Sequence, residues 1–214
     1  MRADWQTGGY GRRGRPWHSP KGNLYATRLT PLPAPLCPDG PAAWGFAAAL
    51  AIREAAIACG ADAAALMLKW PNDVLLSGAK LSGLLLELLE ADGRRAVSLG
   101  IGVNLAHAPT LPDRKAIALS AVTLAPDPLA FLRLLEARLA AWLATHAADG
   151  LAPIRAAWLA HAAGLGGPIT ARLPQCTLHG TFEGLDTHGA LRLATPEGPR
   201  LVTAGDVFFP GEQA

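Results

Sequence analysis

The pattern of hydrophobic and polar positions changes along the chain, and each change predicts a different kind of structure. Apolar and polar residues alternate over residues 23–29, which predicts a strand, and the proline-rich stretch 31–41 closes it. A helix is expected next, because apolar residues recur at helical spacing until Gly60 provides a stop. The apolar face of this helix consists of Trp44, Ala47, Ala48, Ala51, Ile52 and Ala55.

From residue 66 to residue 105 the pattern becomes a series of short apolar runs separated by turn residues. Such runs are typical of buried strands, and we expect them to lie in one sheet. For residues 84–90, periodicity alone leaves a helix open as an alternative. The predicted strands are residues 66–70, 74–76, 81–89 and 96–105.

Two further helices are predicted between residues 127 and 164. The first begins at Asp127, an N-cap residue followed by Pro128 at the first helical position, and ends before Gly150. A shorter helix is expected over residues 152–163, where Gly164 ends it. The longer helix carries one apolar stripe, formed by Leu132, Leu135, Leu139 and Trp142.

Beyond residue 164 the chain is expected to form several short strands with closely spaced turns. This spacing is typical of a small β-barrel that stands as a unit of its own. The glycine-rich stretch 164–168 is the natural boundary, so we expect a larger domain over residues 1–164 and a small domain over residues 165–214. The strands predicted for the small domain are residues 169–173, 178–185, 190–194 and 200–207.

Composition narrows the class of protein. The chain has 214 residues, of which 50% are hydrophobic and 17% charged, so it can bury a proper core and disorder is not expected. The formal net charge is only +2, and the basic excess is concentrated near the N-terminus. A large nucleic-acid-binding face is therefore not indicated.

Cysteine usage and the opening residues favour a cytoplasmic protein. Cys37, Cys59 and Cys176 are widely spaced and form no CxxC pair, so we expect reduced thiols and neither a zinc site nor a disulfide framework. The first six residues lack the apolar core of a signal peptide. The apolar stretch 42–68 is interrupted by charges, so no membrane-spanning helix is expected.

A loop over residues 7–15 is the strongest pointer to function, because it combines four glycines with three arginines. Glycine allows backbone conformations with positive φ and close approach to a ligand. Each guanidinium offers a planar fork of donors that matches phosphate or carboxylate oxygens. The loop thus predicts a phosphate-binding site, with a solvated basic turn or a nucleic-acid-binding segment as alternatives.

Three other clusters each place a polar group at the end of an apolar run. They are Lys-Trp-Pro-Asn-Asp at residues 69–73, Lys-Leu-Ser-Gly at 80–83 and Gly-Ile-Gly-Val-Asn at 100–104. Each also has a structural interpretation taken alone: Asn72 and Asp73 as a hairpin turn, Lys80 as a solvated lysine, and Asn104 as a capped turn.

Taken together, these motifs resemble those of the biotin protein ligase family. Residues 6–17 are similar to the ligand-binding loop of that family, residues 69–73 and 80–83 to its second signature, and residues 100–104 to its third. Residues 184–191 are similar to part of the SH3-like barrel that ends these ligases. The resemblance implies an α+β fold, with a mixed sheet and helices like those of class II aminoacyl-tRNA synthetases and biotin synthetases, followed by a small SH3-like β-barrel.

The same resemblance implies an ATP-dependent ligase with two half-reactions. Biotin and ATP form biotinyl-5′-AMP, and a lysine of a biotin carboxyl carrier protein or domain, in acetyl-CoA carboxylase or another biotin-dependent carboxylase, then takes the biotinyl group. A carboxylate must approach a triphosphate, and two like unit charges about 4 Å apart repel by roughly 4 kcal/mol at an effective dielectric constant near 20. Cations in the loop, together with Mg²⁺, are expected to offset this repulsion.

The resemblance also assigns candidate site residues. Lys80 is expected to reach both the biotin carboxyl group and the α-phosphate, with Arg12 and Asp73 as further catalytic candidates; Asp73 either orients Lys80 or acts on the incoming lysine. No residue is assigned to a resident metal. The candidates for biotin binding are Gln6, Gly9, Tyr10, Gly11, Arg12 and Lys80. Those for ATP and the adenylate are Arg12, Arg15, Trp17, Asn72 and Asn104.

Two departures from the family pattern shape the expectation. Tyr10 stands where several relatives have an arginine, and only five residues precede Gln6, where relatives have a strand and a helix with a Ser/Thr-Asn segment that lines the biotin pocket. We therefore expect a single-function ligase without a DNA-binding domain, short at its N-terminus, that uses neither DNA nor a membrane as partner. Exposed strand edges make a homodimer conceivable. The alternatives are a lipoate-type ligase, a catalytically impaired nucleotide- or biotin-binding module, and a nucleic-acid-binding protein.

Overall fold

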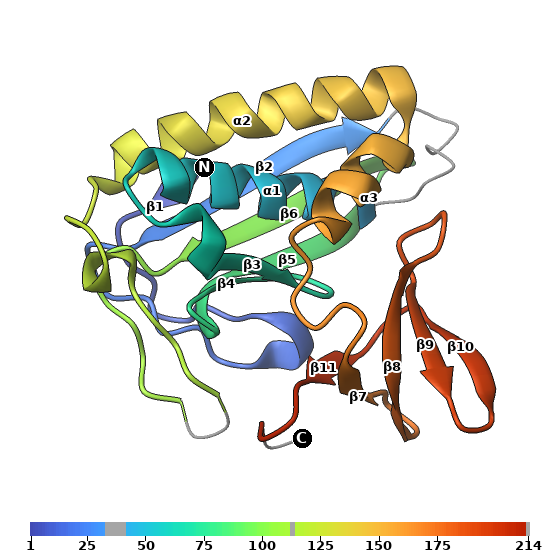
Figure 1. The fold of residues 1–214 in the computed structure, drawn as a ribbon. Helices are drawn as coiled ribbons and strands as arrows, with labels where there is room; N and C mark the ends of the chain where they lie inside the picture. The colour runs from blue at the N-terminus through green and yellow to red at the C-terminus, as the bar shows by residue number, and fades with distance from the viewer. Residues whose placement is uncertain (33–41, 112–113, 213–214) are drawn as a thin grey trace.

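The computed structural model describes residues 1–32, 42–111 and 114–212, and it consists of two sheets and three helices (Figure 1). Most of the predicted proline-rich stretch, together with Cys37, lies outside the described residues. Among the described residues, no helix combines the length and the apolar character that crossing a membrane requires.

The larger sheet has six strands in the order β1-β2-β6-β5-β4-β3, and neighbouring strands pair antiparallel. Isolated parallel bridges at Leu68–Ala162 and Lys80–Ala116 make the arrangement mixed. All four runs predicted between residues 66 and 105 are strands, and residues 84–90 are part of β5 rather than a helix. The strands are β1 (Arg2–Ala3), β2 (Leu24–Leu32), β3 (Leu66–Lys69), β4 (Asp73–Leu76), β5 (Ala79–Ala91) and β6 (Arg94–Val103).

Three helices cover one face of this sheet: α1 (Ala42–Ala58), α2 (Pro128–Asp149) and α3 (Leu151–Leu159) (Figure 1). The predicted N-cap of α2 is confirmed, since the Asp127 carboxylate accepts hydrogen bonds from the backbone N–H groups of Leu129 and Ala130 at 3.0 and 2.9 Å. The sheet residues that face the helices, Leu99, Ile101 and Val103 of β6, are buried, so the core lies between the helices and this face.

Helix α3 is shorter than predicted, because it ends at Leu159 instead of continuing to residue 163. Its continuation pairs with β3 instead: the Leu68 N–H donates to the His161 carbonyl, and the Ala163 N–H donates to the Leu68 carbonyl, both at 2.8 Å. In a longer helix, the His161 carbonyl and the Ala163 N–H would have formed hydrogen bonds within the helix; here β3 satisfies them instead. Hydrophobic periodicity carries no information about such a partner.

The smaller sheet has five antiparallel strands in the order β10-β9-β8-β7-β11. It is an open sheet and not the closed barrel that we expected, because no pairing between the edge strands β10 and β11 occurs among the described residues. The predicted strand 200–207 is in fact two strands, and the chain continues from β11 toward Lys69 of the larger sheet. The strands are β7 (Pro168–Arg172), β8 (Thr177–Leu185), β9 (Leu191–Thr195), β10 (Gly198–Val202) and β11 (Asp206–Phe208).

The two sheets share one continuous core. The indole N–H of Trp70, at the end of β3, donates to the carbonyl of Gly189 in the smaller sheet at 3.1 Å. Gly189 lies directly against the Phe46 ring of α1, and that ring packs on Trp158 of α3 with ring centroids 5.3 Å apart. The smaller sheet is thus held in place by buried contacts and can supply residues to a site on the larger one.

Candidate functional site

A cavity of about 860 Å³ lies on the face of the larger sheet that the helices leave open. Along β6, Leu99, Ile101 and Val103 point to the helices, while Gly100 and Gly102 alternate with them toward the cavity. All the candidate residues for biotin, ATP and catalysis line this cavity: Gln6, Gly9, Tyr10, Gly11, Arg12, Arg15, Trp17, Asn72, Asp73, Lys80 and Asn104.

Trp17 lies on the floor of the cavity, over two glycines. A Cβ atom built on Gly102 would come within 2.6 Å of the Trp17 ring, and one built on Gly83 within 2.9 Å. The second and third sequence motifs therefore carry glycine where the indole must approach the sheet. The Trp17 ring nitrogen is buried and has no hydrogen-bond partner among the described residues.

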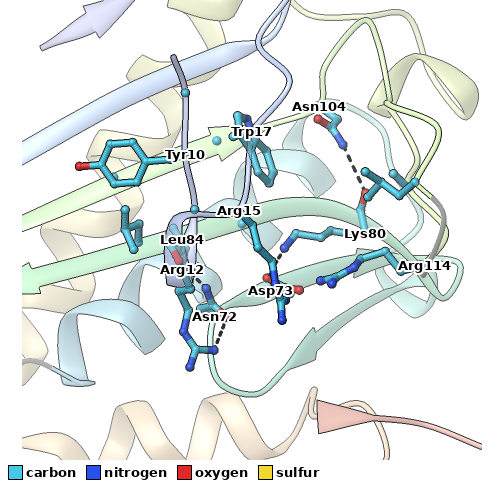
Figure 2. Close-up of a pocket in the computed structure, with 18 of the residues that line it drawn as sticks. Tyr10, Arg12, Arg15, Trp17, Asn72, Asp73, Lys80, Leu84, Asn104 and Arg114 are labelled. Carbon is cyan, nitrogen blue, oxygen red and sulfur yellow. Dashed lines mark hydrogen bonds and ion pairs between the residues drawn. The ribbon is translucent and has the colours of Figure 1, made fainter. Parts of the chain in front are cut away.

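Lys80 and Asp73 face each other from neighbouring strands, β5 and β4. The Lys80 Nζ atom lies 2.7 Å from Asp73 Oδ1, and both side chains are largely buried. The ammonium group also lies over the Trp17 ring, 5.4 Å from its centroid. Figure 2 shows Lys80 and Arg114 both pointing toward Asp73. Lys80 is thus held between a carboxylate and an aromatic face before any ligand is present.

Two amide side chains border this pair. Asn72 Nδ2 donates to the Leu84 carbonyl, and Asn72 Oδ1 accepts a long hydrogen bond of 3.4 Å from Arg12. Asn104 Nδ2 donates to the Lys80 carbonyl at 3.4 Å, whereas its buried Oδ1 has no partner among the described residues (Figure 2). Asn104 therefore retains an acceptor that a ligand donor could satisfy.

A side chain that the sequence reasoning missed fixes the turn after β6, next to Asn104. The buried side chain of Asn23 accepts hydrogen bonds from the backbone N–H groups of Leu105, Ala106 and His107 at 2.9–3.0 Å. Its Nδ2 atom donates to the His107 carbonyl at 2.8 Å. One asparagine thereby ties the start of β2 to the end of β6.

The glycine- and arginine-rich loop, whose arginine side chains are partly exposed, forms part of the rim of the cavity. Its turn is a short 3-10 segment, Arg12–Gly14, in which Arg13 adopts a positive φ of 57°. At its base, the Gln6 side chain accepts a hydrogen bond from the Ser19 hydroxyl at 2.7 Å. A Cβ on Gly9 would lie 2.6 Å from both side-chain oxygens, so this contact requires glycine there.

All three arginines of the loop converge on one carboxylate, Asp206 in β11. Its oxygens lie 3.4 Å from Arg12, 3.2 Å from Arg13 and 2.5 Å from Arg15. Burial lowers the pKa of Arg12, while the charges of Asp206 and Asp73 act in the opposite direction. Because the reference pKa of arginine lies far above neutrality, the guanidinium group still carries its charge at neutral pH.

The sequence reasoning missed several other residues that line the cavity. They come from residues 109–111 and 114–116, from the larger sheet, and from the C-terminal strand and the residues just after it. The only sequence signal among them is the adjacent basic pair Arg114 and Lys115; the others are ordinary strand or turn residues. They include Thr27, Glu87, Ser98, Leu111, Arg114, Lys115, Asp206 and Glu212.

Comparison with known proteins agrees with this geometry. Residues 2–104 match the model of the biotin/lipoate A/B protein ligase family, and residues 164–209 match that of the biotin protein ligase C-terminal domain. A biotin–[acetyl-CoA-carboxylase] ligase from Paracoccus denitrificans is 46% identical, over 96% of this chain and 88% of that protein. A bifunctional ligase/repressor from Bacillus subtilis is 34% identical, and the match spans 96% of this chain and 64% of that protein.

A solved structure gives the same result in three dimensions. The biotin protein ligase from Aquifex aeolicus in complex with biotin and ATP superposes with a TM-score of 0.80 and 26% sequence identity, covering 97% of this chain and 86% of that one. The predicted α+β fold class is thereby confirmed. On the extent of these matches and the order of its motifs, the chain belongs to the biotin protein ligase family.

Proposed function

We propose that this protein is a biotin protein ligase, which activates biotin with ATP and transfers it to a lysine of a biotin carboxyl carrier protein or domain. The observation that carries the proposal is that Lys80 and the arginine loop meet in one cavity, in a chain 46% identical to a biotin–[acetyl-CoA-carboxylase] ligase. This arrangement can bring a carboxylate and a triphosphate together against their mutual repulsion.

In the first half-reaction, a carboxylate oxygen of biotin bonds to the α-phosphorus of ATP as the bond from that phosphorus to pyrophosphate breaks. We assign Lys80 to the reacting oxygens, because its ammonium group is a compact charge fixed by Asp73 at 2.7 Å. A cation held in this way needs little reorganisation as negative charge moves from the carboxylate to the leaving group.

We assign Arg12 and Arg15 to the triphosphate. Guanidinium groups bind phosphate oxygens through two donors at once, and both side chains lie at the cavity rim. Among the described residues, no group of three or more potential ligands could hold a metal ion. Mg²⁺ that entered bound to ATP would share with Arg12 and Arg15 the neutralisation of the phosphate charge.

In the second half-reaction, the amine of the acceptor lysine bonds to the carbonyl carbon of the anhydride, AMP leaves with the bridging oxygen, and the nitrogen loses a proton. We assign Asp73 first as the residue that orients Lys80, since the two are already paired. Its carboxylate is also a group on the cavity wall that could take that proton.

We place biotin against Gln6, Gly9, Tyr10 and Gly11, and the adenylate against Trp17, Asn72 and Asn104. The polar edge of adenine has donors and acceptors that an amide can match, and the buried Asn104 Oδ1 atom lacks a partner among the described residues. We propose a first domain of residues 1–164, which carries the residues assigned above, and a second domain of residues 165–214, which adds Asp206 and Glu212 to the cavity wall. No strand of the described residues is shared between the two sheets, which supports this division.

We propose a cytoplasmic enzyme whose macromolecular partner is the carrier protein and not DNA, in keeping with a net charge of only +2. A homodimer is a further proposal: β10 has one neighbouring strand among the described residues, and Leu201 on it is exposed. Light scattering after size-exclusion chromatography, with and without biotin and ATP, tests the homodimer.

Exchange of labelled pyrophosphate into ATP tests the main proposal. We expect exchange that requires biotin, and attachment of biotin to a carrier domain whose acceptor lysine is intact but not to one with that lysine changed to arginine. Lipoate in place of biotin tests the alternative raised by the shared family model. Exchange with lipoate alone would replace our proposal by a lipoate ligase, and ATP binding without exchange would replace it by a nucleotide-binding module.

A further inference from the structure

Asp206 lies outside the motifs that define the site, yet it contacts all three arginines of the loop. It belongs to β11 of the smaller sheet, and Figure 1 shows the loop lying next to this strand. Its side chain is only 12% exposed. The ligand loop of the larger sheet is therefore tied to a carboxylate from the C-terminal strand.

The strand that carries Asp206 is itself held firmly against the larger sheet. Just beyond β11, the Glu212 carboxylate lies 2.7 Å from Lys69 Nζ and accepts a hydrogen bond from the Phe209 N–H at 2.9 Å. The Lys69 ammonium group also lies over the Phe209 ring, 4.5 Å from its centroid. Asp206 thus has a fixed position, whereas the loop that it contacts has no buried residue in its turn.

The contacts leave most of the arginine donors available. A guanidinium has five N–H donors, and each of the three groups uses one nitrogen on Asp206. One carboxylate also offsets the mutual repulsion of three cations that lie close together, of which Arg12 and Arg15 are assigned to the ligand. Anchoring by Asp206 and phosphate binding by the same loop are therefore compatible.

We infer that Asp206 is a positioning residue for ATP: it holds the arginine loop at the cavity rim, so that the C-terminal sheet forms part of the triphosphate site. This inference rests on the proposed ligase function for the identity of the ligand. The anchoring itself is a property of the ligand-free protein and can be measured without any substrate.

Limited trypsin digestion of the ligand-free protein measures the anchoring. The peptide bonds after Arg12 and Arg13 are potential cleavage sites, whereas Pro16 protects the bond after Arg15. We expect Asp206→Asn to speed cleavage after Arg12 and Arg13 about tenfold, because the ordered turn opens more often without its counter-charge. Glu183→Gln, which removes the 3.8 Å ion pair to Arg192 in the same sheet, is the matched control and should leave that rate unchanged.

Steady-state kinetics of pyrophosphate exchange measure the consequence for the ligand. Asp206→Asn should raise the KM for ATP about tenfold and change the KM for biotin less than twofold. A tenfold change is the scale of one charge-assisted hydrogen bond, reduced because the groups are partly exposed to solvent. Asp206→Glu should recover most of the loss. Because Arg13 is expected to act through Asp206, adding Arg13→Gln to Asp206→Asn should raise the KM for ATP no further.

Each other outcome overturns the inference in a distinct way. Unchanged trypsin cleavage in Asp206→Asn shows that Asp206 does not anchor the loop. Faster cleavage with a lowered KM for ATP shows that Asp206 competes with the phosphates instead of positioning their ligands. Equal increases in both KM values show a general structural defect, and absence of exchange in the wild-type protein removes the ligase function while the digestion result still stands.

Discussion

The cavity brings together two sets of cations that are held in opposite ways. Lys80 extends from β5 of the larger sheet, where Asp73 and the Trp17 ring fix its ammonium group. Arg12, Arg13 and Arg15 extend from a turn with no buried residue, and one carboxylate from another sheet holds them. The first set is supported by strand pairing and packing. The second is supported by charge and by the backbone hydrogen bonds that close its own loop, such as that from the Gly11 N–H to the Arg15 carbonyl at 2.8 Å.

This difference suggests a division of labour within the proposed reaction. A cation at the reacting atoms must already be in place, because reorganisation at the moment of reaction would cost rate. A loop that closes on a triphosphate must be able to open for it, so weaker and more exposed contacts suit that role. Changes at Lys80 should therefore act on kcat, and changes in the loop on the KM for ATP.

The largest effect is expected at Lys80. Lys80→Ala should lower kcat for pyrophosphate exchange by about 10³-fold, because a preorganised cation at the reacting atoms is lost. The KM for ATP should change little. A Lys80→Ala enzyme that keeps its kcat and loses ATP affinity would assign Lys80 to binding and abolish the contrast with the loop.

Gly102→Ala tests whether the packing of Trp17 matters for the part of the site around Lys80. The new methyl group would meet the Trp17 ring at 2.6 Å and displace it, so kcat/KM should fall by about 10²-fold, as for other small displacements near reacting groups. In Gly100→Ala the added carbon meets Leu85 at an ordinary 3.5 Å, and the loss should be much smaller. Equal losses in the two variants would show that the position of Trp17 is unimportant.

Arg12→Ala tests the role of the arginine loop. The KM for ATP should rise about tenfold, since one charge-assisted contact is lost from a partly exposed cluster. The increase relative to wild type should shrink as salt is added, because salt screens exposed charges. A loss confined to kcat, with an unchanged KM for ATP, contradicts the assignment.

The smallest effect on the kinetics is expected for a change in helix α2, which has no assigned role in the reaction. Asp127→Ala removes the N-cap of α2 and should lower the free energy of unfolding by about 1 kcal/mol. Both KM values and kcat should equal those of the wild type at a temperature where the variant is folded. Urea denaturation and exchange kinetics on the same preparation check both parts, and altered kinetics would show that α2 is coupled to the cavity.

Local sequence signals predicted most of the fold. The apolar runs of β3, β4, β5 and β6 are short and bounded by turn residues, and the N-cap at Asp127 marks the start of α2. They failed where a distant partner decides the local structure. The end of α3 depends on pairing with Leu68, and the open C-terminal sheet depends on the path of the chain after β11 toward Lys69.

In the candidate site too, the sequence predicted the residues that lie in local motifs and missed those whose partners are distant in the chain. Residues within recognisable motifs, such as Lys80 and Asn104, were predicted, and the structure places them on one cavity. Asp206 was missed, because an acidic residue in an ordinary strand has no local signature and its three partners lie at the other end of the chain. Asn23 was missed for a similar reason: its three backbone contacts lie more than 80 positions away.

The ion pair between Arg15 and Asp206 also bears on how the protein is made. These residues are 191 positions apart, so the ribosome synthesises Asp206 long after Arg15. The arginine turn must remain without its counter-charge until the segment that carries Asp206 has emerged. Contacts of such long sequence separation form late and slowly, so the rim of the cavity is among the last parts of the newly made protein to reach its final form.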